Sequence, residues 1–357
     1  MNVKRVAILT GGGDCPGLNP AIRGAVLRLA GEGVECLGVR GGWKGMIEGD
    51  LAPLAPAEVA WIVGKGGTIL GTSRTNPYKK EGGVDKVAET FKKHRLDALI
   101  AMGGEDTLGV ASKLWGERKL PVVGVPKTMD NDLSATDYTF GFDTAATVAV
   151  DAAERLRDTG LSHRRVMLLE VMGRHAGWVA LFTGLAAGAD FVCLPERPVD
   201  VADMAAKVKA AYAARGTALV VASEAVEMPG AAQKKELDEF GHEVLKDRGV
   251  AERLTAILEK ATGLEVRSAV IGHIQRGGAP TLFDRILGTR VGVKAAELVL
   301  SGDFGNMVAL KGNEVVPVSL KEATATLKTV DKPWLDLLDS LTALPGAAKP
   351  GAKAVAA

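Results

Sequence analysis

The chain has 357 residues, of which 47% are hydrophobic and 24% are charged, and its 44 Lys and Arg residues nearly balance its 43 Asp and Glu residues. This length and composition indicate a globular protein with a large core and exclude bulk disorder. A net charge of +1 excludes a broad basic surface, so we expect neither nucleic acid nor an anionic membrane as a partner. Any bound anion must be held by a local site.

The amino-terminal apolar run that follows Lys4 and Arg5 is too short for the core of a signal peptide, and no apolar stretch reaches the length of a membrane span. The three cysteines, Cys15, Cys36 and Cys193, have neither metal-ligand spacing nor an even disulfide framework. This pattern fits a reducing compartment, and we expect a cytoplasmic protein.

The first predicted element is a strand over 6–9, and a glycine-rich loop leads from it into a helix over 20–31. Strand, glycine loop and helix form an arrangement that favours phosphate, because glycine lets backbone N–H groups approach an anion and the helix dipole attracts it. A tight turn that needs positive φ explains the loop equally well. A strand over 34–39 follows, then a turn at 41–45 and a second glycine-rich loop that ends at Arg74.

A buried strand is predicted over 97–102, followed by Gly103-Gly104-Glu105-Asp106-Thr107 and a helical run to Trp115. Two glycines admit a ligand, the two acids could hold a divalent cation, and Thr107 could cap the helix while it bonds a phosphate oxygen. A simple capped helix start is the alternative, but it does not explain two adjacent carboxylates that repel each other.

The strand over 122–126 ends at Pro126, and Lys127, Thr128, Asp130 and Asp132 follow it at once. The carboxyl end of a parallel strand opens onto the ligand crevice of an α/β protein, so these groups point to chemistry. Lys127 suits a phosphate, and the two carboxylates can divide base work from metal or hydroxyl binding. The alternative is an ordinary loop whose polar side chains bond their own backbone.

Polar groups follow the later strands too. A helix is predicted over 144–157, and the strand over 166–171 leads to Arg174, a ligand candidate. Strands over 191–194 and 217–222 flank a helix over 200–214, and a strand that starts at Arg267 enters a loop with His273 and Arg276. Their spacing of three places these two on a similar side, as a small-anion site needs; a core histidine with a surface arginine is the alternative.

The last predicted elements are a helix over 284–300 and a hairpin over 308–318, and the charged stretch over 230–248 reads as an exposed insertion. Residues 343–357 are rich in Ala, Pro, Gly and Lys and are expected to be disordered. The alternation of strand and helix predicts an α/β fold of two Rossmann-like lobes with largely parallel sheets.

Together these strand ends supply cations for phosphate oxygens, possible metal ligands and a carboxylate that can accept a hydroxyl proton, which is what phosphoryl transfer requires. Five ordered motifs, spread over roughly residues 3–320, resemble the signatures of the 6-phosphofructokinases. They are Gly12-Gly-Asp-Cys-Pro-Gly17, Gly103-Gly-Glu-Asp-Thr107, Pro126-Lys-Thr-Met-Asp-Asn-Asp132, Glu170-Val-Met-Gly-Arg174 and Gly272-His-Ile-Gln-Arg-Gly-Gly278.

The resemblance implies transfer of a phosphoryl group to the 1-hydroxyl of fructose 6-phosphate by a phosphofructokinase-like fold. It implies a donor lobe over 1–137, to which the chain returns at about 301–325, and a sugar-phosphate lobe over 138–300. It also implies a homo-oligomer, dimer or tetramer, with shared active sites, and Mg²⁺ as cofactor.

The resemblance further assigns roles to single residues. Asp130 is the base, with Lys127, Thr128 and Asp132 beside it in the catalytic group. The donor groups are Gly12, Arg74, Gly104, Asp106 and Thr107, and Glu105 serves the metal. The sugar-phosphate groups are Met172, Gly173, Arg174, Glu224, His273 and Arg276, with Arg165 and Arg267 reaching the 6-phosphate from a neighbouring subunit.

Two positions bear on the phosphoryl donor. ATP-using members of the family have glycine where this chain has Asp106 and Lys127, and members that use pyrophosphate resemble this pair. An Asp side chain adds bulk and a like charge where a nucleotide phosphate would approach, and Lys127 can meet the compact pyrophosphate. We therefore expect a reversible, pyrophosphate-dependent enzyme that serves glycolysis and gluconeogenesis.

Some positions depart from the family pattern: Glu105 stands where well-known members have Asp, and Trp43 replaces a Tyr often seen near the donor. Leu27 stands where the allosteric members have a second effector-site arginine, so we expect no classical nucleotide control. Three alternatives stay open: an ATP-dependent 6-phosphofructokinase, an NAD or lipid kinase, which would lack the sugar-phosphate groups, and a non-catalytic sugar-phosphate sensor.

Overall fold

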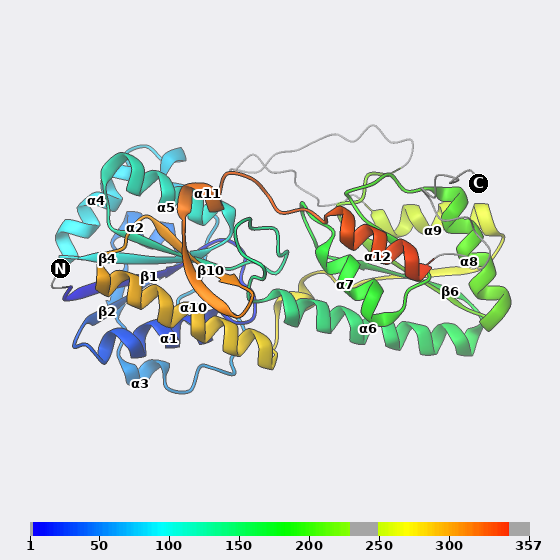
Figure 1. Cartoon of the computed structure of the whole chain (residues 1–357), viewed down its shortest axis with the longest axis horizontal. Coiled ribbons are helices and arrows are strands. Elements are labelled where there is room, and N and C mark those ends of the chain that lie inside the picture. Colours follow the sequence, from blue (N-terminus) through cyan, green and yellow to red (C-terminus); the bar gives the residue numbers. More distant parts are fainter. Residues whose placement is uncertain (1–2, 229–248, 343–357) are drawn as a thin grey trace, which may run out of the picture. The chain divides into compact units, whose positions relative to one another are not determined.

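The computed structural model describes residues 3–228 and 249–342, which form two compact units (Figure 1). Among these residues, the first unit is made of 3–148 and 273–328, and the second of 149–228, 249–272 and 329–342. The expected insertion over 230–248 and the expected disordered tail over 343–357 lie outside the described residues. None of the described helices has the length and apolar character needed to cross a membrane.

The first unit is built on a seven-stranded sheet in the order β11-β10-β5-β4-β1-β2-β3. Its strands are β1 (Arg5–Thr10), β2 (Glu35–Val39), β3 (Leu51–Pro53), β4 (Ala98–Gly103), β5 (Val122–Pro126), β10 (Asn306–Lys311) and β11 (Glu314–Ser319). Only the two edge pairs, β2 with β3 and β10 with β11, are antiparallel. The predicted closing hairpin is therefore confirmed, and β1, β4 and β5 lie side by side with their carboxyl ends on one edge.

Helices cover both faces of this sheet (Figure 1). One face carries α2 (Trp43–Glu48), α4 (Gly83–His94), α5 (Glu105–Arg118) and α11 (Leu320–Ala323), and the other carries α1 (Leu18–Ala30) and α10 (Leu282–Ser301). The short helices α3 (Pro56–Val59) and η1 (Pro77–Lys79) lie in the connection between β3 and α4.

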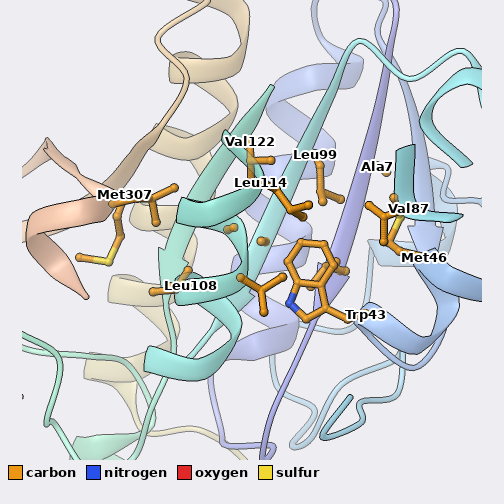
Figure 2. Packing of buried hydrophobic residues seen from close by; sticks show 14 of the residues in the cluster. Ala7, Trp43, Met46, Val87, Leu99, Leu108, Leu114, Val122 and Met307 are labelled. Atoms are coloured by element: carbon orange, nitrogen blue, oxygen red, sulfur yellow. The ribbon is translucent and has the colours of Figure 1, made fainter. Parts of the chain in front are cut away.

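Trp43 belongs to the buried cluster beneath α5 and is only 1% exposed (Figure 2). Its indole N–H donates a hydrogen bond to the carbonyl oxygen of Thr107 at 3.3 Å. The sequence had suggested only a turn over 41–45. The structure has a turn at Gly41 and Gly42, both with positive φ, and then a helix, because the large apolar side chain of Trp43 is buried in the core.

The helices α1 and α10 lie side by side with their backbones in close approach (Figure 1). A Cβ at Gly24 would lie 2.6 Å from the carbonyl oxygen of Thr289, and one at Gly292 would overlap the carbonyl oxygen of Ala21. This contact places α10 in the first unit, whereas the expected lobe over 138–300 had included it. A row of small residues on one helix does not reveal, from the sequence alone, which other helix packs against it.

The second unit is built on a four-stranded parallel sheet in the order β7-β8-β6-β9. Its strands are β6 (Val166–Val171), β7 (Phe191–Cys193), β8 (Ala218–Ser223) and β9 (Val266–Val270). The helices around it are α7 (Trp178–Ala187), α8 (Val201–Arg215), α9 (Val250–Thr262) and α12 (Lys332–Thr342). Helix α6 (Phe142–His163) and the short η2 (Gly272–Arg276) contain the points where the chain passes between the units. The expected α/β fold with largely parallel sheets is confirmed.

We predict that Gly292→Ala lowers the free energy of unfolding by about 1–3 kcal/mol, because its methyl group overlaps backbone that cannot move aside easily. The matched control is Gly116→Ala in α5, where a Cβ meets nothing within 4 Å; it should stabilise by about 0.5–1 kcal/mol. Urea unfolding of both variants measures the difference, and equal effects of the two substitutions would contradict backbone contact between α1 and α10.

Candidate active site

Lys127 joins the loops that follow three neighbouring strands of the first unit. Its side chain is 4% exposed, and Nζ donates a hydrogen bond to the carbonyl oxygen of Gly13 at 2.5 Å. Its backbone N–H donates to the carbonyl oxygen of Gly103 at 3.0 Å. The polar groups expected at the carboxyl ends of β1, β4 and β5 therefore do meet at one edge of the sheet.

Two glycines of the loop after β1, Gly11 and Gly13, make room for side chains from other parts of the first unit. A Cβ at Gly11 would lie 2.5 Å from Oγ1 of Thr107, and one at Gly13 would overlap the guanidinium of Arg276. The N–H groups of Gly11 and Gly12 donate to backbone carbonyl oxygens, those of Met102 and Ser73. The expected phosphate cradle is therefore not formed by these two N–H groups.

Gly12 has a φ of +79° and is the point where the second glycine-rich loop meets the first. Its carbonyl oxygen accepts a hydrogen bond from Oγ1 of Thr72 at 2.6 Å, and its N–H donates to Ser73 at 3.1 Å. Because Arg74 directly follows these residues, the structure brings the loop that carries Arg74 up to Gly12 and, through Gly13, to Lys127.

The donor loop after β4 differs from the prediction in one respect. Helix α5 begins at Glu105 with Gly104 as its N-cap, and no side chain caps it. The expectation that Thr107 caps this helix is therefore wrong. Thr107 is buried instead, with its side chain packed into the space left by Gly11 and Gly103, while Glu105 and Asp106 lie in the first turn of α5.

The two carboxylates after β5 are arranged by Thr128. Its Oγ1 donates a hydrogen bond to Oδ1 of Asp132 at 3.3 Å and accepts one from the backbone N–H of Asp130 at 3.1 Å. Between them, Asn131 adopts a left-handed backbone with a φ of +53°. Oδ1 of Asp130 is buried, and none of the described residues hydrogen-bonds to it. A buried carboxylate oxygen in this state can accept a proton from a bound hydroxyl.

The site is desolvated, and this shifts the ionisation of its charged groups. Burial, followed by the charge of Asp130, raises the pKa of Asp132 to about 7. Burial likewise lowers the pKa of Lys127; the negative charges of Asp130 and Asp132 oppose this shift, and the positive charge of Arg276 adds to it. The buried cation and the carboxylates therefore depend on one another.

In the part of the chain that the structure describes, no three His, Cys, Asp or Glu side chains form a metal-binding cluster. Mg²⁺ does not require one, because it commonly binds one or two carboxylates and completes its shell with water and substrate phosphates. Glu105 lies close enough to Asp132 for its charge to raise the pKa of that carboxyl. These residues fit an ion that the substrate helps to hold.

In the second unit, the expected sugar-phosphate residues Met172, Gly173 and Arg174 follow β6, and Glu224 follows the adjacent β8. The backbone N–H of Gly173 donates to Oε1 of Glu224 at 3.2 Å, so these residues form one group. Sequence reasoning missed Glu196, whose Oε1 accepts from the backbone N–H groups of Gly177 at 2.8 Å and Val330 at 3.0 Å. Glu196 lies outside the five motifs, so the sequence alone did not mark it as a candidate residue.

Arg165 and Arg267 lie at the other end of this sheet. Arg165 directly precedes β6, Arg267 is the second residue of β9, and both form ion pairs with Glu265. A six-residue strand spans about 20 Å, so these arginines lie well apart from Arg174, which follows the opposite end of β6.

Arg276 and His273 belong to the first unit, three residues apart in η2. The guanidinium of Arg276 donates to the carbonyl oxygen of Asp14 at 3.0 Å and contacts Gly13, so it is part of the group around Lys127 and not a surface arginine.

Comparison with known proteins decides the family. The family model described as "Phosphofructokinase" matches residues 5–299. The chain belongs to the phosphofructokinase family. Among its relatives, this phosphofructokinase is 50% identical over 336 residues to the "Pyrophosphate--fructose 6-phosphate 1-phosphotransferase" of Dictyoglomus thermophilum, covering 93% of this chain and 96% of that protein.

This phosphofructokinase is also 47% identical over 331 residues to the "ATP-dependent 6-phosphofructokinase 3" of Streptomyces coelicolor, covering 91% of this chain and 96% of that protein. Among solved structures, it matches Pichia pastoris phosphofructokinase in the T-state with a TM-score of 0.79 and 30% identity. That match covers 91% of this chain, which spans only 36% of the Pichia chain. Both donor classes therefore occur among the relatives.

We predict that Asp132→Asn stabilises the protein at pH 8. The pKa of Asp132 is raised from 3.8 to about 7 in the folded state, so the folded protein binds more protons than the unfolded chain between these pH values. The stability contribution of this group is therefore largest below pH 4 and is lost as the pH rises through 7. Asparagine carries no charge and avoids that loss.

Urea unfolding between pH 4 and 8 tests this prediction, with the exposed Asp158→Asn as control. The stability gain of Asp132→Asn over the wild type should grow as the pH rises from 4 to 8, and the control should show no such trend. A variant that is less stable than the wild type at pH 8 would show that the Asp132 charge is well accommodated.

Proposed function

We propose that this phosphofructokinase reversibly transfers a phosphoryl group from pyrophosphate to the 1-hydroxyl of fructose 6-phosphate, giving fructose 1,6-bisphosphate and phosphate. The observation that carries the proposal is the buried Lys127, held on the glycine loop, with Asp130 and Asp132 three and five residues further along. The relatives at about 50% identity that are named for this reaction support it. A reversible reaction of this kind would serve both glycolysis and gluconeogenesis.

Asp130 is the proposed base. Its buried Oδ1 makes no hydrogen bond to a described residue and can accept the proton of the attacking hydroxyl. Thr128 positions the Asp130 backbone and contacts Asp132, whose raised pKa reduces the negative charge that would otherwise repel the donor.

The donor preference follows from Lys127 and Asp106. The ammonium of Lys127 lies 3.5 Å from the place where a Cβ on Gly12 would be, so the cation stands beside the loop that is proposed to hold the donor phosphates. Asp106, in the first turn of α5, adds a negative side chain where a nucleotide would need space. Arg74, Gly104 and Thr107 complete the proposed donor site.

The residues proposed to serve the sugar phosphate are Met172, Gly173, Arg174, Glu224, His273 and Arg276. The roughly 20 Å between the two ends of β6 supports a homo-oligomer, dimer or tetramer, in which Arg165 and Arg267 complete the site of a neighbouring subunit. In such an assembly every active site is shared.

Mg²⁺ is the proposed cofactor, with Glu105 among its ligands; when bound, it neutralises charge on the transferring phosphoryl group. By binding the ion, Glu105 would hold and orient the donor indirectly. A cytoplasmic location is proposed from the cysteines, because Cys15, Cys36 and Cys193 are all free and buried.

We predict that the wild type has its higher kcat/KM with pyrophosphate, and that Asp106→Gly combined with Lys127→Gly lowers this value by about 10- to 100-fold, the worth of a charge-assisted contact. The same double variant should gain activity with ATP. A coupled assay of aldolase products with either donor alone measures both values. A double variant that stays fully active with pyrophosphate and gains nothing with ATP would contradict the donor argument.

Two further results separate the alternatives. Higher wild-type efficiency with ATP would favour an ATP-dependent 6-phosphofructokinase. If Asp130→Ala left the only measurable activity unchanged, the chain would instead be a sugar-phosphate sensor.

A further inference from the structure

The segment that follows α11 pairs with the backbone of the catalytic loop. Leu327 forms an antiparallel bridge with Leu133, and the backbone N–H of Lys328 donates to the carbonyl oxygen of Asp132 at 2.7 Å. Both residues belong to the same unit as the loop. The contact therefore reaches the peptide of a carboxylate that sits in the reaction centre.

The side chain of Lys328 holds the same loop at three points. Its Nζ donates to Oδ1 of Asn131 at 3.1 Å, to the carbonyl oxygen of Thr136 at 3.0 Å and to that of Asp137 at 2.9 Å. An ammonium has three N–H donors, so it can make all three of these contacts at once.

Asn131 is the residue through which this contact acts. It lies between Asp130 and Asp132 in a left-handed backbone conformation, which asparagine adopts more readily than other non-glycine residues. Its Oδ1 accepts from the backbone N–H of Thr139 at 3.1 Å as well as from Lys328. The turn that separates the two carboxylates is thus fixed through the Asn131 side chain, and Lys328 is the one cation bound to it among the described residues.

We propose that Lys328 is a positioning residue for phosphoryl transfer, which fixes the turn at Asn131 and so sets the relative placement of Asp130 and Asp132. This inference rests on the proposed function, because it takes Asp130 as the base. Lys328 does not contact the reacting atoms in this scheme; it acts through the loop.

The ionisation of Lys328 provides a readout that a purely structural role would not give. Burial lowers the pKa of Lys328 to about 8; the charges of Asp137 and Asp132 oppose the shift, and that of Lys311 adds to it. As the pH rises through 8, the amine loses a proton and one N–H donor, and the three-point contact is reduced to two. The turnover number should therefore fall on the alkaline side.

The test compares Lys328→Met with Lys311→Met in the full chain. Lys311 is the matched control, because its Nζ also lies near Asp137, at 3.7 Å, but its side chain is half exposed and makes no contact with Asn131. Lys328→Met should lower kcat by about 10- to 100-fold, as misplaced catalytic groups do, with both KM values within about two-fold of the wild type. Lys311→Met should keep the wild-type kcat.

The pH profile of kcat should show an alkaline limb near pH 8 in the wild type. In Lys311→Met the limb should remain but lie at somewhat higher pH, because the charge of Lys311 no longer lowers the pKa of Lys328, and in Lys328→Met it should be absent. A wild-type kcat in Lys328→Met, or a loss confined to KM, would overturn the proposal.

If Lys328→Met does not fold, Asn131→Gly takes its place. This substitution keeps the left-handed turn and removes the acceptor. It should lower kcat with KM unchanged, and an unchanged kcat would overturn the proposal.

Where Lys328→Met and Asn131→Gly both fold, the double variant should have a kcat less than about three-fold below that of the worse single variant. The reason is that both substitutions remove the same contact. If the effects of the two substitutions on kcat were fully additive, Lys328 would not act through Asn131. A wild type that turns over fructose 6-phosphate only with ATP would refute the proposed donor, and the Lys328 comparison would then be made with ATP and judged by the same outcomes.

Discussion

The site depends on one buried charge, the Lys127 ammonium, and on the carbonyl oxygen of Gly13 that accepts its hydrogen bond. A lysine that is almost wholly buried costs several kcal/mol unless opposite charges and acceptors surround it. The charge of Asp130 opposes the effect of burial on Lys127, and the loop after β1 supplies the acceptor. The same ammonium lies next to Gly12, a residue of the proposed donor site.

The carboxyl edge of the first sheet is held in place by parts of the chain that are distant in sequence. Arg276 reaches Gly13 and Asp14 from η2, α10 packs on α1 through glycine, and the segment after α11 returns to the catalytic loop. The chain then enters the second unit at Thr329, where Val330 donates to Glu196 and Glu196 also holds Gly177. Leu327 and Lys328 thus hold a loop of the first unit, and Val330 contacts Glu196 in the second.

Much of this was predictable from the sequence, for identifiable reasons. Apolar runs predicted β5 and β6 with correct ends, and the clustering of polar groups after β1, β4 and β5 followed from parallel topology. The capping role predicted for Thr107 was wrong, because helix α5 begins two residues before it. A glycine that makes room for a distant side chain, as Gly11 and Gly13 do, has the same sequence signal as one that binds an anion. Lys328 and Glu196 escaped notice because their roles arise only from long-range contacts.

Binding of a pyrophosphate-sized donor by the desolvated Lys127 cation can be tested without turnover. Methylenediphosphonate, a stable analogue of pyrophosphate, would be titrated calorimetrically with Mg²⁺ into the wild type and into Lys127→Met, with fructose 6-phosphate titrated separately into each. We expect the Kd for the diphosphonate to weaken by about 10- to 100-fold in the variant while that for the sugar phosphate stays the same. An unchanged Kd for the diphosphonate would contradict the account.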